Sequence, residues 1–307
     1  MNILLTAINA KYIHSNLAVY SLRACAGEYR DAVELAEYTI NTQKDYILEE
    51  LYKRKPDVLC FSCYIWNIDY VTDIAREYKK LCPSVPIWVG GPEVSYEVEA
   101  FLRENPYIDG VMIGEGEDTF RELCGYYAHK RKLSDIAGIA FRKNSTGNST
   151  SVNNIGGNKV GEIVFTSPRP IKNMSEIPFC YDTLDDFSNR IIYYESSRGC
   201  PFSCSYCLSS VDKTLRFRDT EIVKRELKFF IDQKVPQIKF VDRTFNCNHA
   251  HAMELWRFIK ANDNGVTNFH FEISADLLNQ EELELISDMR PGLIQLEIGV
   301  QSTNEVT

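Results

Sequence analysis

The sequence predicts an α/β protein built from two successive sets of βα units. Over residues 1–130, short apolar runs alternate with helical patterns, as in chains that wind a parallel sheet. The alternation stops over residues 131–189 and resumes over residues 190–307. Three cysteines lie close together at the start of the second set. We therefore expect two α/β domains joined by a linker, with chemistry concentrated at these cysteines.

The first domain, residues 1–130, contains five predicted βα units. Each apolar run of strand length is followed by a pattern of helix length. The strands are expected at residues 3–8, 33–38, 57–64, 87–89 and 111–113, and the helices at 15–29, 43–54, 67–81, 94–104 and 117–129. Five such units predict a doubly wound, flavodoxin-like sheet, which binds ligands at the carboxyl ends of its strands.

The segment 131–189 has a different composition and is interpreted as a linker with short β-strands. Two strands are expected at residues 136–142 and 162–165. Between them lies a tract rich in Asn, Ser, Gly and Thr, Lys143–Gly161, which predicts a flexible loop. Three prolines between residues 168 and 178 then favour extended backbone.

The third segment, residues 190–307, contains four predicted strands and the helices that connect them. The strands are expected at residues 191–195, 237–241, 269–273 and 293–298, and the helices at 219–233, 249–262 and 279–289. The helix after the fourth strand barely begins, so the segment is expected to be part of a larger (β/α) barrel. We interpret the chain as truncated within that barrel.

Composition and charge restrict the class of protein. The formal net charge is −9, which argues against broad attraction to nucleic acid. No run approaches the roughly 18 apolar residues of a membrane span. Ten cysteines without an export signal favour a reducing compartment, in which thiols are buried or bind metal. We expect a cytoplasmic protein that binds neither nucleic acid nor membrane.

Cys200, Cys204 and Cys207 are the strongest functional signal. Thiolates are the ligands of iron-sulfur clusters, and the spacing lets one tight loop wrap three sulfurs around a cluster. A fourth cysteine is missing nearby, which leaves one iron open for another ligand. The alternatives are three cysteines packed as small apolar residues, or a structural zinc site. Zinc usually requires a fourth ligand, and the nearest histidines, His249 and His251, are distant in sequence.

The Cys-x3-Cys-x2-Cys spacing after a strand resembles the radical S-adenosylmethionine (SAM) superfamily. The resemblance implies a [4Fe-4S] cluster on Cys200, Cys204 and Cys207 with SAM on the open iron. It also implies an external electron donor such as flavodoxin or ferredoxin, and places Tyr206 near the adenine of SAM. Further SAM-binding residues are implied at the later strand ends, namely Asp242, Glu272, Ser274, Glu297 and Gln301. For each one taken singly, ordinary solvation of a strand end is the alternative.

The first domain ahead of such a barrel is similar to cobalamin-binding domains of radical SAM proteins. The resemblance implies that cobalamin (B12) binds at small or polar residues after strands three to five, namely Ser62, Gly90, Gly91, Gly114, Glu115 and Gly116. The Asp-x-His-x-x-Gly motif that supplies a cobalt ligand is absent around His14, so no histidine of this domain is expected on cobalt. A dinucleotide site is excluded, because Asn9–Tyr12 lacks the glycine-rich turn.

Together these features predict a radical SAM enzyme that cleaves SAM reductively and depends on cobalamin. The resemblance implies methyltransferase or oxidative cyclase chemistry, an oxidoreductase step in the latter case, on a small-molecule substrate. One alternative is a radical SAM enzyme whose cobalamin domain is vestigial. Another is a non-enzymatic iron-sulfur sensor or scaffold. Cys60 and Cys63 are spaced like a redox pair, but we interpret them as buried thiols of a strand.

Overall fold

The computed structural model describes residues 1–143, 152–153, 159–210, 214–300 and 302–304. The chain divides into two compact units. Unit 1 contains residues 1–172 and 178–184, and unit 2 contains residues 173–177 and 185–307. Among the described residues, no helix has the length and apolar character needed to cross a membrane.

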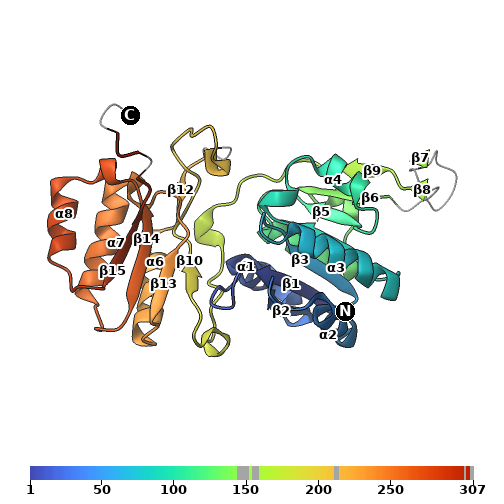
Figure 1. The fold of residues 1–307 in the computed structure, drawn as a ribbon, viewed down its shortest axis with the longest axis horizontal. Coiled ribbons are helices and arrows are strands. Elements are labelled where there is room, and N and C mark those ends of the chain that lie inside the picture. Colours follow the sequence, from blue (N-terminus) through green and yellow to red (C-terminus); the bar gives the residue numbers. More distant parts are fainter. Residues whose placement is uncertain (144–151, 154–158, 211–213, 301, 305–307) are drawn as a thin grey trace. The chain divides into compact units, whose positions relative to one another are not determined.

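Unit 1 is a sheet with helices on both faces (Figure 1). Its strand order is β2-β1-β3-β4-β5-β6-β9, and the first five strands are parallel. The strands are β1 (Ile3–Asn9), β2 (Val33–Thr39), β3 (Val58–Ser62), β4 (Ile87–Gly90), β5 (Gly110–Met112), β6 (Ile139–Arg142) and β9 (Ile163–Phe165). The helices are α1 (Leu17–Cys25), α2 (Lys44–Arg54), α3 (Ile68–Leu81), α4 (Val98–Glu104) and α5 (Glu117–Tyr127).

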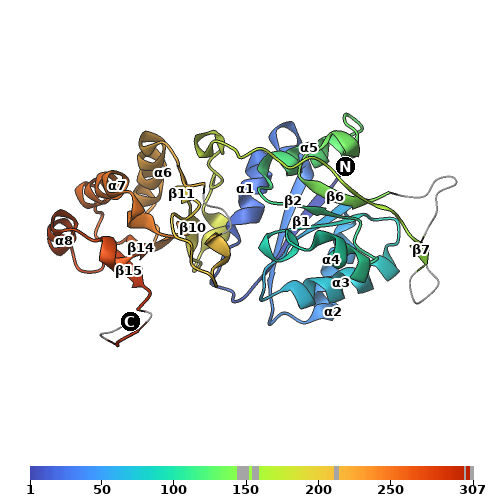
Figure 2. The ribbon, with the colours of Figure 1, turned by 90° about the horizontal axis from the view of Figure 1, so that it is seen from above.

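The helices of unit 1 form two layers because the central strands are apolar on both faces. Every residue of β1 and β3 is buried. Helices α1 and α5 pack on each other over one face, and α2 and α3 pack on each other over the opposite face (Figure 2). The order 2-1-3-4-5 places a topological switch point between β1 and β3, where open parallel sheets bind their ligands. The predicted doubly wound class is therefore confirmed.

The two short strands that we assigned to the linker belong to this sheet instead. Strand β6 pairs antiparallel with β5, and β9 pairs antiparallel with β6. They cover the edge of β5, whose backbone groups would otherwise remain open to another strand. Two further short strands, β7 (Val152–Asn153) and β8 (Lys159–Val160), pair with each other. Most of the predicted loop Lys143–Gly161 lies outside the described residues.

Unit 2 contains a four-stranded parallel sheet in the order β10-β13-β14-β15. Its helices lie on one side of the sheet (Figures 1 and 2), as expected for part of a (β/α) barrel. The strands are β10 (Ile192–Tyr194), β13 (Gln237–Phe240), β14 (Asn268–Ile273) and β15 (Ile294–Ile298). The helices are α6 (Thr220–Asp232), α7 (His249–Ala261) and α8 (Gln280–Ser287).

Side-chain caps fix where these helices begin. Asp219 accepts hydrogen bonds from two backbone N–H groups of the first turn of α6, and Asn248 accepts one from the first turn of α7. Helix α8 starts with a capping box between Asn279 and Glu282. Each helix therefore begins just beyond the loop that follows a strand. The residues at the strand ends stay outside the helices and can form the site.

We predict that Gly110→Ala destabilises unit 1 by about 2 kcal/mol, the usual cost of overpacking a core. A Cβ at Gly110 would lie 2.3 Å from the ring of Trp88. That ring is 1% exposed, and its Nε1 donates to the hydroxyl of Tyr127 at 2.6 Å, so it has little room to move. Chemical denaturation followed by circular dichroism measures the change.

The matched control is Gly125→Ala, in the last turn of α5. A Cβ there would meet only ordinary contacts, the shortest at 3.4 Å, and alanine favours a helix by about 1 kcal/mol over glycine. This variant is expected to be neutral or more stable. Equal stability of the two variants would contradict the packing argument.

Candidate cofactor sites

The three predicted cluster ligands lie in a loop that leaves the carboxyl end of β10. The base of the loop is closed by two short antiparallel strands, β11 (Ser197–Arg198) and β12 (Arg216–Phe217). The N–H of Arg218 also donates to the carbonyl of Ser196 at 2.8 Å. The loop therefore starts and ends at one fixed point beside the sheet.

Asp242, at the carboxyl end of β13, holds the start of this loop. One carboxylate oxygen accepts the N–H of Ser196 at 2.8 Å. The other accepts the hydroxyls of Ser196 at 2.5 Å and of Ser197 at 2.7 Å. The residue is 1% exposed, and burial raises the pKa of the carboxyl although the bonds from Ser196 and Ser197 oppose the shift. Three donors converge on one buried acceptor group, which fixes the direction in which the chain enters the cysteine loop.

A buried ion pair holds the other end of the loop. The Arg218 guanidinium lies 2.6 Å from Glu226 on α6, and both side chains are under 8% exposed. The second oxygen of Glu226 accepts the hydroxyl of Tyr194, at the end of β10, at 2.6 Å. The guanidinium also donates to the carbonyl of Met174 at 2.7 Å. Buried hydrogen bonds from Arg218 and Tyr194 thus join strand, helix and returning loop away from water.

Within the loop the three thiols differ in exposure. Cys200 is 9% exposed, and its sulfur lies 3.8 Å from the hydroxyl of Thr244. Cys204 is exposed and Cys207 is half-buried, and the N–H of Cys207 donates to the carbonyl of Cys204 at 3.1 Å. Gly199 has a φ of +89°, and a Cβ there would lie 2.6 Å from the carbonyl oxygen of Thr214. Glycine is therefore required at the sharp turn into the first thiol.

The donor set fits an iron-sulfur cluster better than a single metal ion. All three ligands are thiolates, the ligands of iron-sulfur clusters, whereas structural zinc takes four ligands. Each ligand of a cubane cluster binds a different iron, so three thiols on one loop hold the cluster and leave one iron open. Three thiols on one short loop that begins at the tight Gly199 turn fit that requirement.

The other residues predicted to bind SAM surround the same edge of the sheet. Tyr206 lies in the cysteine loop with 78% of its surface exposed. Glu272 is on β14 and Glu297 on β15, and the two are direct neighbours across the strands. The N–H of Ser274 donates to the side-chain oxygen of Asn246 at 3.0 Å. Gln301 lies outside the described residues. The carboxyl edge thus brings Asp242, Glu272, Ser274 and Glu297 together with the cysteine loop, while their roles remain predictions.

In unit 1, the residues predicted for cobalamin lie at the carboxyl edge of the sheet. Ser62 is 8% exposed and accepts the side-chain amide of Asn16 at 3.2 Å. Gly91 has a φ of +118°, and a Cβ there would lie 2.4 Å from the carbonyl oxygen of Cys63, so the fold itself requires this glycine. Gly114 has a φ of +74° with open space above its Cα. Of these glycines, Gly114 is the one that offers bare backbone to a ligand.

The remaining three predicted residues frame the same edge. A Cβ at Gly90 would touch Met112 at 3.4 Å, and a Cβ at Gly116 would approach Leu22 at 3.0 Å. Glu115 accepts the N–H of Lys172 at 3.4 Å. Gly90 and Gly116 therefore have packing reasons to be small, and Glu115 has a partner within unit 1.

The sequence interpretation missed the apolar side chains at this edge. Large apolar residues are exposed in the loops after β1 and β3, with exposed fractions of 69% for Tyr12, 78% for Ile65 and 45% for Trp66. The ring of Trp66 stacks on Tyr64 at 4.5 Å with an angle of 6°. Exposed apolar side chains gathered at a switch point fit a broad ring such as a corrin. The sequence feature that could have predicted this surface is the position of these apolar residues in the loops directly after two apolar strands.

Cys60 and Cys63 are buried thiols, as predicted. Both are 0% exposed and free. Burial raises the pKa of both thiols well above the ordinary value, so they remain protonated and unreactive. His14 follows β1, and its carbonyl accepts the side chain of Asn9 at 3.0 Å.

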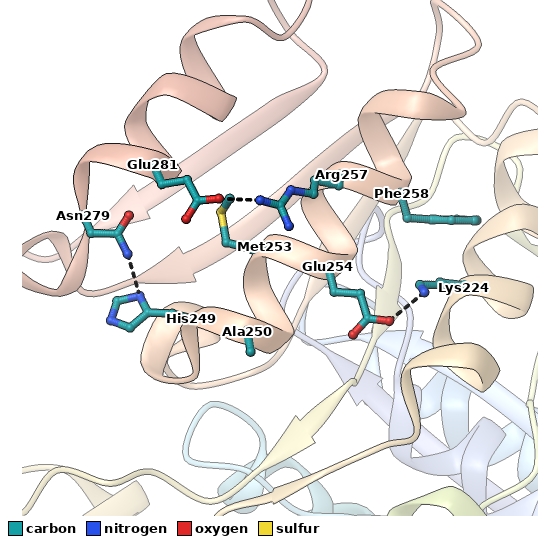
Figure 3. Close-up of a pocket in the computed structure, with 9 residues that line it drawn as sticks. All are labelled: Lys224, His249, Ala250, Met253, Glu254, Arg257, Phe258, Asn279 and Glu281. Carbon is teal, nitrogen blue, oxygen red and sulfur yellow. Dashed lines mark hydrogen bonds and ion pairs between the residues drawn. The ribbon is translucent and has the colours of Figure 1, made fainter.

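A separate pocket of 720 Å³ lies on the helical side of unit 2 (Figure 3). Ion pairs cross it between Lys224 and Glu254 at 2.6 Å and between Arg257 and Glu281. It is formed by residues of α6 and α7 and by the start of α8, and it contains none of the predicted site residues. Its position on the helical layer separates it from the cysteine loop, and we assign it no cofactor.

Comparison with known proteins assigns both units. The family model of the B12 binding domain matches residues 3–124, and that of the radical SAM superfamily matches residues 194–307. The chain is a radical SAM protein with a B12-binding domain. Together the two domains imply cobalamin, SAM and a [4Fe-4S] cluster as cofactors.

The relatives include enzymes of two kinds. An uncharacterised methyltransferase of Pyrococcus horikoshii is 31% identical over 68% of this chain and 44% of its own length. The cobalamin-dependent radical SAM methyltransferase TokK of Streptomyces tokunonensis is 30% identical over 65% of the chain and 30% of its own length. An anaerobic magnesium-protoporphyrin IX monomethyl ester cyclase of Rubrivivax gelatinosus is 23% identical over 92% of the chain and 50% of its own length.

A solved structure shares the fold over nearly the whole chain. The cobalamin-dependent SAM radical enzyme OxsB, with aqua-cobalamin and SAM bound, has a TM-score of 0.74 at 18% identity and covers 97% of this chain. This chain corresponds to 44% of OxsB, and it spans half or less of each of the three relatives above.

We predict that His251 makes unit 2 less stable in mild acid. The imidazole is 5% exposed beside Ser196, and burial lowers its pKa from 6.5 to about 4. The unfolded chain therefore binds a proton at higher pH than the folded chain does. Stability is full above pH 6.5 and falls as the pH drops toward 4, by up to about 3 kcal/mol. Denaturant titrations across this pH range measure the loss.

His251→Gln is expected to flatten this pH dependence. His129→Asn, at an exposed position with a φ of +59° that asparagine tolerates, is expected to leave it unchanged. A slope that survives in the His251 variant would show that another group titrates.

Proposed function

We propose that this chain carries the cofactor-binding part of a cobalamin-dependent radical SAM enzyme, and that the enzyme transfers a methyl group to a small-molecule substrate. The observation that carries the proposal is the loop of Cys200, Cys204 and Cys207, fixed beside β10 within the matched radical SAM domain. The B12-binding domain ahead of it and the methyltransferases among the relatives favour methyl transfer. An external electron donor, such as a flavodoxin or a ferredoxin, belongs to the same proposal.

In this proposal the residues hold and orient the cofactors. When bound, the cluster supplies the electron that cleaves SAM, and cobalamin supplies a centre for methyl transfer. Cys200, Cys204 and Cys207 would hold the cluster as thiolates, and SAM would bind at the remaining iron. Asp242 fixes the loop through Ser196 and Ser197. Exposed Tyr206 supplies an aromatic face for the adenine, and acidic Glu272 and Glu297 face the cationic part of SAM.

Oxidative cyclisation is the second candidate chemistry. The cyclase of Rubrivivax gelatinosus aligns with 92% of this chain, more than the methyltransferases named above. In this chain, oxidative cyclisation would use the same cluster and the same SAM site as methyl transfer. The two chemistries differ in what becomes of the substrate, so product analysis separates them once SAM cleavage is established.

We predict that the protein, reconstituted anaerobically with iron and sulfide, gives the EPR signal of a reduced [4Fe-4S] cluster that shifts when SAM is added. Cys204→Ala is expected to abolish the signal, because it removes one of three ligands. Cys82→Ala, a half-buried thiol in unit 1, is the control and is expected to keep both signal and shift. A cluster without a response to SAM would favour a sensor or scaffold, and no cluster at all would refute the proposal.

We predict that unit 1 binds hydroxocobalamin at a stoichiometry of one, measured by absorbance titration. Ile65→Asp places a charge in the exposed apolar loop after β3 and is expected to weaken binding by about tenfold or more. Leu81→Asp is the control, because this residue is 56% exposed at the end of α3, near the amino ends of the strands. Absence of binding to the wild-type protein would favour the vestigial domain.

A further inference from the structure

The face of the unit 2 sheet opposite the helices carries ionisable side chains. Strand residues alternate in direction, and the helix-facing set is apolar, including the buried Phe240 and Phe271. The alternate positions on the four strands hold a tyrosine, a lysine, a histidine and two glutamates. They are Tyr193 on β10, Lys239 on β13, His270 and Glu272 on β14, and Glu297 on β15. A sheet face that served only for packing would be apolar, so these ionisable side chains indicate another role for this face.

Two of these groups repel each other. Glu272 and Glu297 are paired directly across β14 and β15. Like charges at directly opposed positions destabilise a sheet, and they turn away from each other or share a proton unless a cation lies between them. The arrangement therefore needs a counter-charge.

Lys239 supplies that counter-charge from the next strand. Its Nζ lies 2.8 Å from Glu297 Oε2 and 3.5 Å from Glu272 Oε1. His270 Nε2 lies 3.0 Å from the same oxygen of Glu297. The lysine side chain is only 21% exposed, so water screens these contacts less than at an open surface. One ammonium group thus fixes the directions of two carboxylates.

The network is charged at neutral pH. Burial opposes the charge on Lys239, but its hydrogen bond to Glu297 and the charges of both glutamates raise its pKa. The hydrogen bond from Lys239 lowers the pKa of Glu297. Burial and the nearby Lys239 charge lower the pKa of His270, which favours the neutral imidazole. One lysine and two glutamates leave a net charge of −1 at this face.

We propose that Lys239 is a positioning residue for SAM, which holds Glu272 and Glu297 apart and oriented so that they meet its cationic groups. The inference rests on the proposed function, because it presupposes that SAM binds at this edge of the sheet. A net negative charge with fixed carboxylates matches the sulfonium and ammonium groups of SAM. Lys239 lies in register with His270, two residues before Glu272 on β14, so it need not touch SAM itself.

The test measures the dissociation constant of SAM by equilibrium dialysis with the anaerobically reconstituted protein. Lys239→Met is expected to weaken SAM binding about tenfold, the scale of a lost charge-assisted contact, at unchanged cluster content. Lys239→Arg keeps the charge and is expected to restore affinity to within about threefold. Lys239→Gln carries the same test if the methionine variant fails to fold.

Lys224→Met is the matched control. Lys224 is also 21% exposed and also bridges two glutamates, Glu221 and Glu254, but on the helical layer. It is expected to leave SAM affinity unchanged. Comparing both lysine variants separates a local effect on SAM from a general loss of ion pairs.

A double-mutant cycle tests the mechanism. In a Glu272→Gln background there is less repulsion to relieve, so Lys239→Met is expected to weaken SAM binding by a clearly smaller factor than in the wild type. Equal SAM affinity of wild type and the Lys239 variants would overturn the inference while leaving the proposed function intact. Failure of the wild type to bind SAM would overturn both.

Discussion

The cysteine loop depends on the buried carboxylate of Asp242. Three hydrogen bonds from two adjacent serines converge on it. A buried charge without these donors would be costly, so the two serines and the carboxylate must fold together. The direction of the chain toward Cys200 is therefore set before any cofactor binds. The Arg218–Glu226 pair does the same for the return of the loop.

Both units separate their packing surfaces from their predicted binding surfaces in the same way. Apolar strand positions hold the helices, and the carboxyl ends of the strands hold the polar or exposed groups. In unit 1 these are Ser62, the bare backbone of Gly114 and the exposed aromatic loops. In unit 2 they are the cysteine loop and the acidic residues. Because the helices are held by the packing surfaces, most groups at the strand ends can differ between relatives without loss of the scaffold.

The sequence predicts local features well and distant partnerships poorly. The strands and helices of both units follow from periodicity, and the cluster loop follows from the spacing of Cys200, Cys204 and Cys207. The partners of Asp242 lie 45 and 46 residues away and carry no pattern of their own. Strands β6 and β9 were assigned to the linker because pairing with β5 is a tertiary event. The role of Gly91 likewise depends on the backbone of Cys63, which only the fold brings near.

The segment that connects the two units is divided between them in reverse order. Residues 173–177 belong to unit 2, and residues 178–184, which follow them, belong to unit 1. Each stretch is anchored, since Met174 accepts a bond from Arg218 and Tyr181 stacks with Tyr20 at 6.3 Å. A single cut cannot release two intact domains, because at least one fragment would leave a packed segment with the other. During evolution, exchange of one domain for another would face the same obstacle, so the two halves are expected to be inherited as a pair.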